Sequence, residues 1–550
     1  MFTDARTIAP NSTLQADICI VGAGIAGISI AREFIGRRES VVLLEGGGLD
    51  FTKSLRDLPT VLRRHSLGEQ ALSGAKNAGQ PYYPVRFTRV RAFGGSSRAW
   101  HEHRGLQARP LDAIDFEARD GLPEHGWPID KAEIDPFYER AQQICGLGPF
   151  AYDTKTWETQ GYGARLPLDP ALVESVIFKF GTNSRFDRYK NDFAQADNIN
   201  LVLHATAVHL ADNGERVDRV DCATLSGSRF GVRARTFILA AGAVETARLL
   251  LVSRDNQPEG IGNGRDLVGR CFMEHPDAAV GFLIPNPDLD RSAFRLYSQQ
   301  PAGENLRVEA MFRLSDAVLR KERLLNAVLR LRPTYSSGVA AAVQSAQVVR
   351  RSVHFGVPTP GLAKHALRAV LGAPQVLRHY ATWRSGRSPV IFGIDAMAEQ
   401  APAMSSRVRL ARSRDRLGIP KTILDWRLAT TDWSSLRRTM EIFGDAVREA
   451  RMGTVISTIG VEQPAVFGNW HHLGTARMHY DPTQGVVDEH CRVHEMANLY
   501  VAGGAVFPTG GYANPSLTIV ALSLRLANHL KSTPNGSAIA AGVGSLISTF

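Results

Sequence analysis

The chain has 550 residues, of which 44% are hydrophobic and 21% are charged. These values are typical of a globular protein with a large core, and they exclude a disordered or fibrous chain. The formal net charge is +10, but the segment from Arg323 to Ile394 alone carries ten basic residues and no Asp or Glu. Nucleic-acid binding is disfavoured, because this segment has few aromatic residues for base stacking and no groove-reading module.

The five cysteines are widely scattered, with no paired or clustered spacing typical of metal ligands. We therefore expect reduced thiols and no structural metal. The N-terminal residues lack the apolar core of a signal peptide, and no uncharged apolar run reaches the length of about 18 residues that a membrane span needs. A cytoplasmic location is the expectation from these features.

The first strong pattern is an apolar run at 17–22, followed by small and apolar residues at helical spacing over 24–36 and a second apolar run at 41–45. This order predicts a strand, a helix and a strand. By contrast, residues 1–13 and 532–550 have the composition of loose ends.

Gly22, Gly24 and Gly27 form a G-x-G-x-x-G turn between the first strand and the helix. Such glycines allow a tight turn, backbone approach to a pyrophosphate and close packing of helix on strand. Glu45 ends the second strand, where a carboxylate can accept hydrogen bonds from a ribose hydroxyl group. The pattern predicts a dinucleotide site, and both NAD and FAD satisfy it.

Further along, alternating residues over 199–242 predict a meander that ends in a buried strand, and 243–253 has the spacing of a helix. The chain thus returns to the nucleotide unit after an excursion through 106–198, which predicts two interleaved units.

Two later helices are expected. The first lies within 425–451 and could be capped by Thr431 or Asp432. The second spans 514–530 and follows a buried strand at 498–503, with Asn514 at the cap and a proline in the first turn.

Several motifs resemble those of the glucose-methanol-choline (GMC) oxidoreductases, which are FAD enzymes. They are GWPIDKAEIDPFYERA (126–141), VGRCFMEHP (268–276), HHLGTARM (471–478), GVVDEHCRVHEMANLYVAGGAVFPT (485–509) and NPSLTIVALSLRLA (514–527). The resemblance extends from residue 17 to 530, with no match recognised over 290–390, and it decides for FAD over NAD.

The resemblance implies an α/β fold, in which a Rossmann-type FAD-binding domain is interleaved with a substrate domain built on an antiparallel sheet flanked by helices. We expect the FAD-binding domain at 14–105, 199–280 and 465–532. The substrate domain would then comprise 106–198 and 281–464, with a basic helical insertion at about 323–394.

The resemblance also implies that His471 takes the hydroxyl proton of the substrate while hydride passes to flavin N5. Asn514 matches the second active-site position, although a role confined to helix capping is the alternative. His472 either supports catalysis or hydrogen-bonds behind the active-site wall, since neighbouring side chains on an extended segment point to opposite faces. The helix after Pro515 would direct its positive end at the flavin.

A glycine-rich loop resembles the segment that lies against the flavin ring in the family. The expected cofactor contacts from this loop and from later segments are Gly94, Gly95, Ser96, Ser97, Val208, Gly503, Gly504, Asn514 and Pro515.

Some relatives attach the flavin through a histidine just before an aromatic residue, but here Ala99 precedes Trp100. We expect non-covalent FAD, with His101 and His103 as the remaining candidates for attachment.

The expected activity is oxidation of a CH–OH group of a sugar, polyol or other alcohol to a carbonyl. A lyase of the same fold that acts on a hydroxylated substrate and a non-catalytic flavoprotein are the alternatives. No cysteine cluster offers an iron–sulfur relay, so electrons would leave from the flavin to O₂, a quinone or a redox protein.

The acid-free segment mixes apolar and basic residues at helical spacing, with Pro358, Pro360 and Pro374 as expected interruptions. We interpret 340–390 as a surface insertion that contacts a membrane, an acceptor protein or an amphiphilic substrate. A solvated helical excursion is the alternative.

Overall fold

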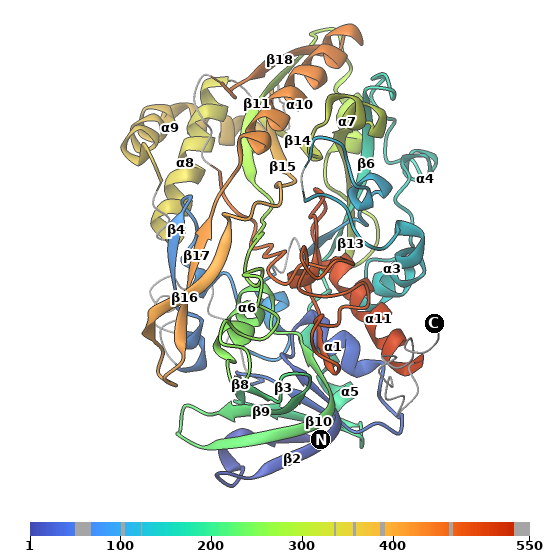
Figure 1. Ribbon diagram of the computed structural model, residues 1–550. Helices are drawn as coiled ribbons and strands as arrows, with labels where there is room; N and C mark the ends of the chain where they lie inside the picture. The colour runs from blue at the N-terminus through green and yellow to red at the C-terminus, as the bar shows by residue number, and fades with distance from the viewer. Residues whose placement is uncertain are drawn as a thin grey trace, which may run out of the picture.

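The computed structural model describes residues 1–49, 68–100, 105–122, 124–334, 337–355, 359–384, 391–460 and 466–532. Two eight-stranded sheets and a three-stranded sheet form its framework (Figure 1). In the view of Figure 1, one large sheet lies at the bottom of the molecule and the other at the top.

The first sheet consists of β1 (Phe2–Asp4), β2 (Thr13–Val21), β3 (Val41–Leu44), β7 (Ile199–Leu203), β8 (Thr206–Asp212), β9 (Val217–Ala223), β10 (Arg229–Leu239) and β19 (Leu499–Val501). Its order is β1-β7-β3-β2-β10-β9-β8, with β19 also paired to β10. The pairs from β1 to β10 and the pair of β10 with β19 are parallel, whereas β8, β9 and the start of β10 form an antiparallel meander.

The predicted strand, helix and strand of the nucleotide unit are confirmed as β2, α1 (Ile25–Arg32) and β3. The central residues are apolar on both faces because helices cover the sheet, and all four residues of β3 are buried. α1 packs against α11 (Ser516–Ser532), so the C-terminal helix covers the first nucleotide-binding element. The helix predicted at 243–253 is confirmed as α6 (Ala243–Val252).

The N-terminal segment belongs to this sheet, and the expectation of a loose end at 1–13 is wrong. β1 adds a parallel edge strand to β7, and the side chain of Thr3 donates to Asn200 at 2.8 Å. The local sequence gave no sign of this pairing because the partner strand lies almost 200 residues away. The C-terminal end beyond residue 532 lies outside the described residues.

The second large sheet is antiparallel throughout. Its strands are β5 (Leu106–Ala108), β6 (Val173–Gly181), β11 (Asp277–Pro285), β12 (Gln300–Pro301), β13 (Leu306–Leu314), β14 (Ala327–Thr334), β15 (Ile391–Ala398) and β18 (Gly453–Ser457). The predicted α/β fold class, a Rossmann-type unit interleaved with a unit on an antiparallel sheet, is confirmed. The exact residues at which the units exchange stay a prediction.

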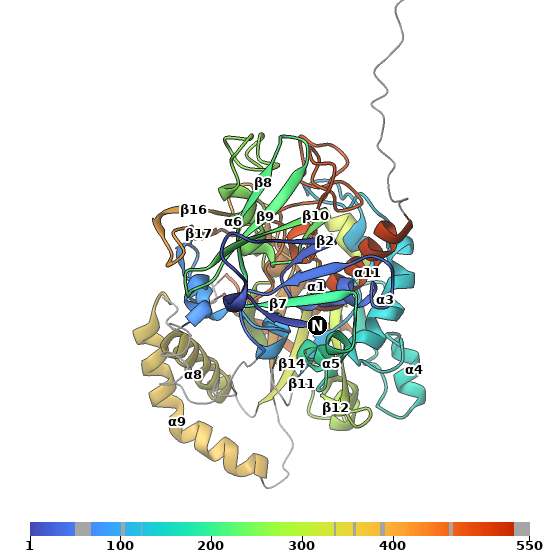
Figure 2. The same cartoon turned by 90° about the horizontal axis from the view of Figure 1, so that it is seen from below.

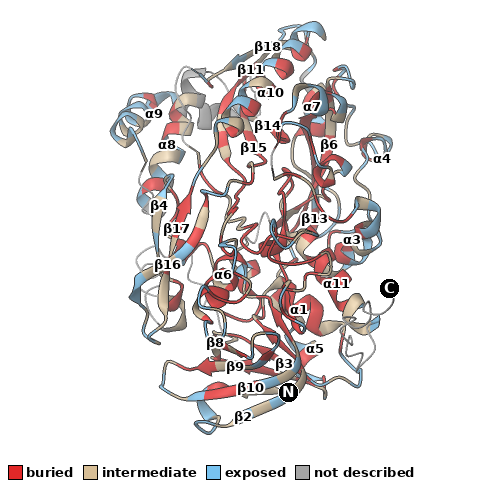
Figure 3. Ribbon diagram, in the orientation of Figure 1, coloured by how far each residue is buried: buried red, intermediate tan, exposed pale blue. Residues whose placement is uncertain are grey.

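Buried side chains form separate cores around the two sheets, which Figure 3 shows as red on both. The amphipathic helix α10 (Thr430–Glu449) packs over the antiparallel sheet, with the rings of Phe312 and Phe443 5.1 Å apart. The predicted caps of this helix are wrong, because Ala429 occupies the cap position. Asp432 lies in the first turn, where its carboxylate accepts from the backbone nitrogens of Ala429 and Ala401 at 2.6 and 2.7 Å.

A small sheet connects distant parts of the chain. It comprises β4 (Ala75–Gly79), β16 (Arg407–Arg414) and β17 (Pro420–Trp426), and β17 pairs with β4 in parallel. Further α-helices in the part of the chain that the structure describes are α3 (Lys131–Cys145), α4 (Thr154–Thr159), α5 (Lys190–Ala194) and α7 (Asp316–Glu322).

The acid-free segment is helical only in part, because it begins with β14 and ends in β15, which belong to the antiparallel sheet. Between these strands, α8 (Ser337–Phe355) and α9 (Leu362–Arg384) form a helical hairpin at the margin of the molecule (Figure 2). Pro374 lies within α9, so the expected break at this proline is wrong. Pro360 precedes α9, and Pro358 lies outside the described residues. Within the described ranges, no helix combines the length and apolar character needed to cross a membrane.

Candidate functional site

A cavity of about 510 Å³ lies between the two large sheets. On one side its walls come from the nucleotide unit, including Gly22, Gly24 and Glu45. On the other side they come from the antiparallel sheet, through Gln107 of β5 and Phe180 of β6. The cavity therefore brings together a dinucleotide-binding turn and the surface of a second unit.

The glycine turn between β2 and α1 is shaped by close backbone contacts. Gly22 has φ +107°, and a Cβ atom there would lie 2.6 Å from the Ala240 carbonyl oxygen. A Cβ atom on Gly27 would lie 1.9 Å from the Gly22 oxygen, so this glycine permits the packing of α1 on β2. Gly24 caps α1, and a Cβ atom on Gly95 would lie 2.8 Å from the Gly24 Cα atom. The two glycine-rich loops thus form one backbone cradle.

Glu45 lies at the end of β3 with its carboxylate buried against this cradle. Its oxygens accept from the backbone nitrogens of Ala23 at 3.1 Å and Gly47 at 2.9 Å. Burial raises the pKa of Glu45, while these two donors oppose the shift. Each oxygen keeps a further lone pair, which a ribose hydroxyl group could use.

Most residues predicted to bind the cofactor line this one cavity. They are Gly22, Gly24, Glu45, Gly95, Ser96, Ser97, Val208, Gly503, Gly504, Asn514 and Pro515. Gly27 and Gly94 lie behind the wall, and Gly94 adopts φ +94° to turn the loop. The Ser97 hydroxyl group donates to the Gly94 oxygen at 2.6 Å and accepts from the Phe186 nitrogen at 3.0 Å, so this side chain also holds the loop in place.

His471 faces the cavity and is connected to two other side chains. Its Nδ1 lies 3.0 Å from Nδ1 of His275, and its Nε2 lies 3.3 Å from Nδ2 of Asn514. His275 is fully buried, and its Nε2 lies 3.3 Å from the Gly510 carbonyl oxygen. Burial first, and then the neighbouring rings of His275 and His472, lower the pKa of His471 well below its usual value.

Backbone strain lies next to this histidine. Trp470 adopts φ +64°, a left-handed conformation that costs a non-glycine residue about 1–2 kcal/mol. Its ring packs edge-on to Tyr83 with centroids 5.8 Å apart. The next residue, His471, donates its backbone N–H to Glu274 Oε2 at 2.9 Å. The turn at Trp470 and the buried carboxylate together direct His471 into the cavity.

His472 points to different partners from those of His471. Its Nε2 binds the Tyr82 hydroxyl group at 2.9 Å, and Tyr82 in turn donates to Glu274. The His472 side chain is only 7% exposed, and burial lowers its pKa to about 3. His472 also lines the cavity, so support of catalysis and a purely hydrogen-bonding role both stay predictions.

Glu274 organises this part of the wall. Its Oε2 also accepts from the backbone nitrogens of Asn469 at 3.0 Å and His275 at 3.2 Å. Burial raises the pKa of Glu274 to about 7, although its hydrogen bonds favour the charged form.

Asn514 lies two residues before the first residue of α11, but it does not cap the helix. The helix begins at Ser516, and Asn514 Oδ1 has no hydrogen-bond partner within the described residues. Its Nδ2 donates to His471. The alternative of a role confined to capping is therefore wrong, and the amide is available to a ligand.

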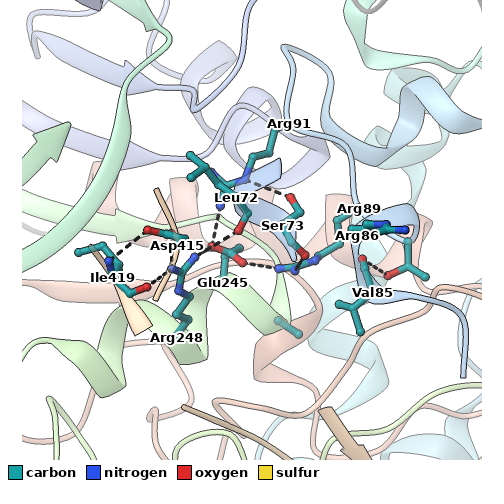
Figure 4. Close-up of polar contacts among 12 residues, drawn as sticks. Leu72, Ser73, Val85, Arg86, Arg89, Arg91, Glu245, Arg248, Asp415 and Ile419 are labelled. Carbon is teal, nitrogen blue, oxygen red and sulfur yellow. Dashed lines mark hydrogen bonds and ion pairs between the residues drawn. The ribbon is translucent and has the colours of Figure 1, made fainter. Parts of the chain in front are cut away.

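A cluster of buried charges lines another part of the cavity (Figure 4). Arg89, Arg91 and Arg248 converge on Glu245, in the first turn of α6. Arg91 Nη2 lies 2.7 Å and Arg248 Nη1 lies 3.4 Å from Glu245 Oε2, and Arg89 pairs with Oε1. Arg248 also pairs with Asp415 at 2.5 Å.

Although burial opposes ionisation of Glu245, the guanidinium groups of Arg91, Arg89 and Arg248 hold its pKa well below the usual range. Three cations thus share two carboxylates, whose side chains are 18% and 4% exposed. Burial also lowers the pKa of Arg89.

The residues present fit an FAD molecule. The glycine cradle permits close approach of a diphosphate, and Glu45 is placed at the end of β3 as a ribose acceptor requires. Two buried polar atoms at the cavity wall, Asn514 Oδ1 and Arg89 Nε, have no partner within the described residues. Such orphaned atoms are expected where a polar ligand completes the site.

The cysteines and the residues near Trp100 bear on the predictions about a metal site and about covalent attachment of the flavin. All five cysteines are buried and free. Across the ranges that the structure describes, no group of three or more His, Cys, Asp or Glu residues could hold a metal ion. Ala99 and Trp100 line the cavity, and His101 and His103 lie outside the described residues.

Sequence reasoning missed several residues of the site. Glu274 and His275 lie within the quoted motif at 268–276, so the motif gave a signal for their region but not for their contacts. Tyr82, Arg89 and Glu245 had no signal, because each acts through a partner more than 150 positions away.

Two family models match the chain. Residues 17–259 match a family described as "FAD dependent oxidoreductase", and residues 402–523 match one described as "GMC oxidoreductase". Together with the fold and the cavity, these matches show that the protein is an FAD-dependent oxidoreductase. The match over residues 402–523 confirms the similarity to GMC oxidoreductases that the sequence motifs predicted.

Similar proteins cover almost the whole chain. Paromamine 6'-oxidase of Streptomyces fradiae is 24% identical, over 93% of this chain and 90% of that protein. The fructose dehydrogenase large subunit of Gluconobacter japonicus is 23% identical, over 94% and 98%. The 2-methyl-1,2-propanediol dehydrogenase of Mycolicibacterium austroafricanum is 24% identical, over 94% and 95%.

Solved structures show the same fold. Pyridoxine 4-oxidase from "Mesorbium loti" aligns with a TM-score of 0.54 at 16% identity, over 94% of this chain and 100% of that one. A formate oxidase aligns with a TM-score of 0.52 at 17% identity, over 95% and 99%.

Proposed function

We propose that this protein oxidises a CH–OH group of a sugar, polyol or other alcohol to a carbonyl, with His471 as the base. The observation that carries the proposal is the pairing of His471 Nε2 with Asn514 Nδ2 at the wall of the FAD cavity. The named relatives act on hydroxylated compounds, including fructose and a propanediol, which agrees with this class of substrate. Bound FAD would supply the hydride acceptor, at flavin N5.

The hydrogen bonds of His275 support one tautomer of His471, with the proton on Nδ1. His275 Nε2 faces the carbonyl oxygen of Gly510, which can only accept, so this nitrogen carries the proton. His275 Nδ1 then has a lone pair and accepts from Nδ1–H of His471. Nε2 of His471 is thereby left as the unprotonated nitrogen that faces the cavity.

Each residue of the pair would have a distinct task. The substrate hydroxyl group would displace the Asn514 amide from the lone pair of His471 Nε2, which then accepts the hydroxyl proton. The lowered pKa of His471 keeps the ring neutral beforehand. Asn514 Nδ2 donates to the substrate oxygen and orients it. Asn469 and Gln107 also line the cavity and offer amide groups, which suit a substrate with several hydroxyl groups.

The cofactor would be held without a covalent bond. The proposal rests on the sequence at Ala99 and Trp100, which lacks the histidine of relatives that attach their flavin. The acceptor of the electrons would be O₂, a quinone or a redox protein.

Anaerobic titration of the purified protein with sugars, polyols and other alcohols tests the function directly. We expect at least one of them to bleach the flavin absorbance and to yield the corresponding carbonyl compound. Cleavage of a hydroxylated substrate without bleaching would instead support a lyase. A flavin that no compound reduces, in a protein that still binds FAD, would support a non-catalytic flavoprotein.

Replacement of His275 tests the tautomer. We expect His275→Leu to lower kcat about fivefold with little change in KM, because loss of one hydrogen bond of about 1 kcal/mol leaves His471 Nδ1–H without its acceptor. The matched variant His275→Asn keeps an acceptor oxygen near the position of Nδ1 and should recover most of the rate. A similar kcat for both variants and the wild-type protein would contradict this role.

A further inference from the structure

The outward face of α9 carries a stripe of strongly exposed aliphatic side chains. Leu367 is 60%, Val370 70%, Leu371 69% and Leu377 70% exposed. These positions recur at helical spacing and therefore share one side of the helix. The exposed Pro374 lies on the same side.

The opposite face of α9 is fixed against α8. A Cβ atom on Gly372 would lie 2.2 Å from Cβ of Ala342, which shows that the two helices approach closely. Ala342 is 3% exposed, and His365 Nδ1 of α9 lies 3.3 Å from the Ser345 hydroxyl group of α8. These contacts determine the rotation of α9, so the stripe cannot turn inward without breaking the hairpin.

Such exposure is unusual for the rest of the molecule. Among the described residues outside the hairpin, the exposed aliphatic side chains are Met1 (67%), Ile35 (36%), Met404 (38%) and Ile456 (45%), which lie far apart in the sequence. Four aliphatic side chains of at least 60% exposure on one helix form a continuous apolar surface, which in a water-soluble domain marks an interaction site.

Charge indicates which partner fits this surface. Lys364 and Arg368 are exposed on the same helix, and Arg350 is exposed on α8. From Arg323 to Ile394 the sequence contains ten basic and no acidic residues. An aliphatic face with basic side chains beside it, in a stretch of sequence without Asp or Glu, matches the anionic headgroups and acyl chains of a bilayer surface.

We propose that α9 docks this protein on an anionic lipid bilayer. The helix lies in the plane of the interface, with the side chains of Leu367, Val370, Leu371 and Leu377 at the level of the acyl chains. Lys364 and Arg368 lie at the level of the lipid phosphates. This docking goes beyond the proposed oxidation reaction and does not depend on it.

Co-sedimentation of the FAD-loaded protein with lipid vesicles tests the proposal. We expect it to pellet with vesicles of phosphatidylcholine and phosphatidylglycerol, and much less with phosphatidylcholine alone or at high salt. The double variant Val370→Ser/Leu371→Ser should partition at least about tenfold less, since two aliphatic groups no longer enter the bilayer. Lys364→Gln/Arg368→Gln should reduce binding to the anionic vesicles only.

Ile456→Ser is the matched control, because it removes an exposed aliphatic side chain from β18, outside the hairpin. Unchanged partitioning of the α9 variants relative to this control would overturn the proposal, as would equal binding of the wild-type protein to neutral and anionic vesicles. Sedimentation velocity provides a further outcome. A dimer that the Val370→Ser/Leu371→Ser variant dissociates would show that a second copy of the chain covers the stripe, and would overturn docking on lipid.

Discussion

His471→Ala should slow reduction of the bound flavin by substrate at least about a hundredfold, the lower range for loss of a general base. The variant keeps the fold, since the backbone N–H that binds Glu274 remains. Anaerobic stopped-flow absorbance measures the rate. His490→Ala is the matched control, because the His490 side chain is 45% exposed. Wild-type reduction by the His471→Ala protein would exclude this residue as the base.

The pH dependence of the flavin-reduction rate is a second test of His471 as the base. Only the neutral ring accepts a proton, and burial together with His275 and His472 lowers the pKa of His471. The rate should therefore hold below pH 6.5, the usual histidine pKa, and fall only as the pH drops through the lowered value. A decrease in the rate near pH 7 that is absent in the Glu274→Gln variant would instead report the titration of Glu274, whose pKa is about 7.

Glu245→Gln should be strongly destabilising. The amide has the shape of the carboxylate but no charge. Arg89, Arg91 and Arg248 would then repel one another, with Asp415 as their only paired carboxylate among the described residues. Removal of one partner from a buried ion pair costs about 3–5 kcal/mol. Urea unfolding of the FAD-loaded protein measures the change in free energy.

The control for this variant is Glu449→Gln, at an exposed position near the end of α10. We expect it to alter the free energy of unfolding by less than about 0.5 kcal/mol. If Glu245→Gln were equally mild, the three arginines would have to be neutralised by another group, and a bound diphosphate would be the first to test by comparing unfolding with and without FAD.

The parts of the fold that the sequence predicted well are governed by local patterns. The unit β2, α1 and β3 follows from apolar runs and a glycine turn, and α6 and α10 follow from helical spacing. β1 and the small sheet of β4, β16 and β17 could not be predicted, because short strands acquire their stability from partners far along the chain.

The residues of the site likewise fall into those that local motifs predict and those that depend on distant partners. The glycines, Glu45, His471 and Asn514 lie in recognisable motifs and meet in one cavity. The pairing of His471 with His275 spans 196 positions and that of Arg89 with Glu245 spans 156. Contacts of this kind depend on how β11 and the two large sheets are placed in space, which no local pattern contains.

The left-handed backbone at Trp470 has a consequence for efforts to broaden the range of accepted compounds. This indole lines the cavity, and its conformation is one that Gly and Asn adopt with less strain. Trp470→Gly or Trp470→Asn would enlarge the chamber while relief of strain offsets part of the lost packing on Tyr83. A mutant library for bulkier alcohols would therefore best begin at this position.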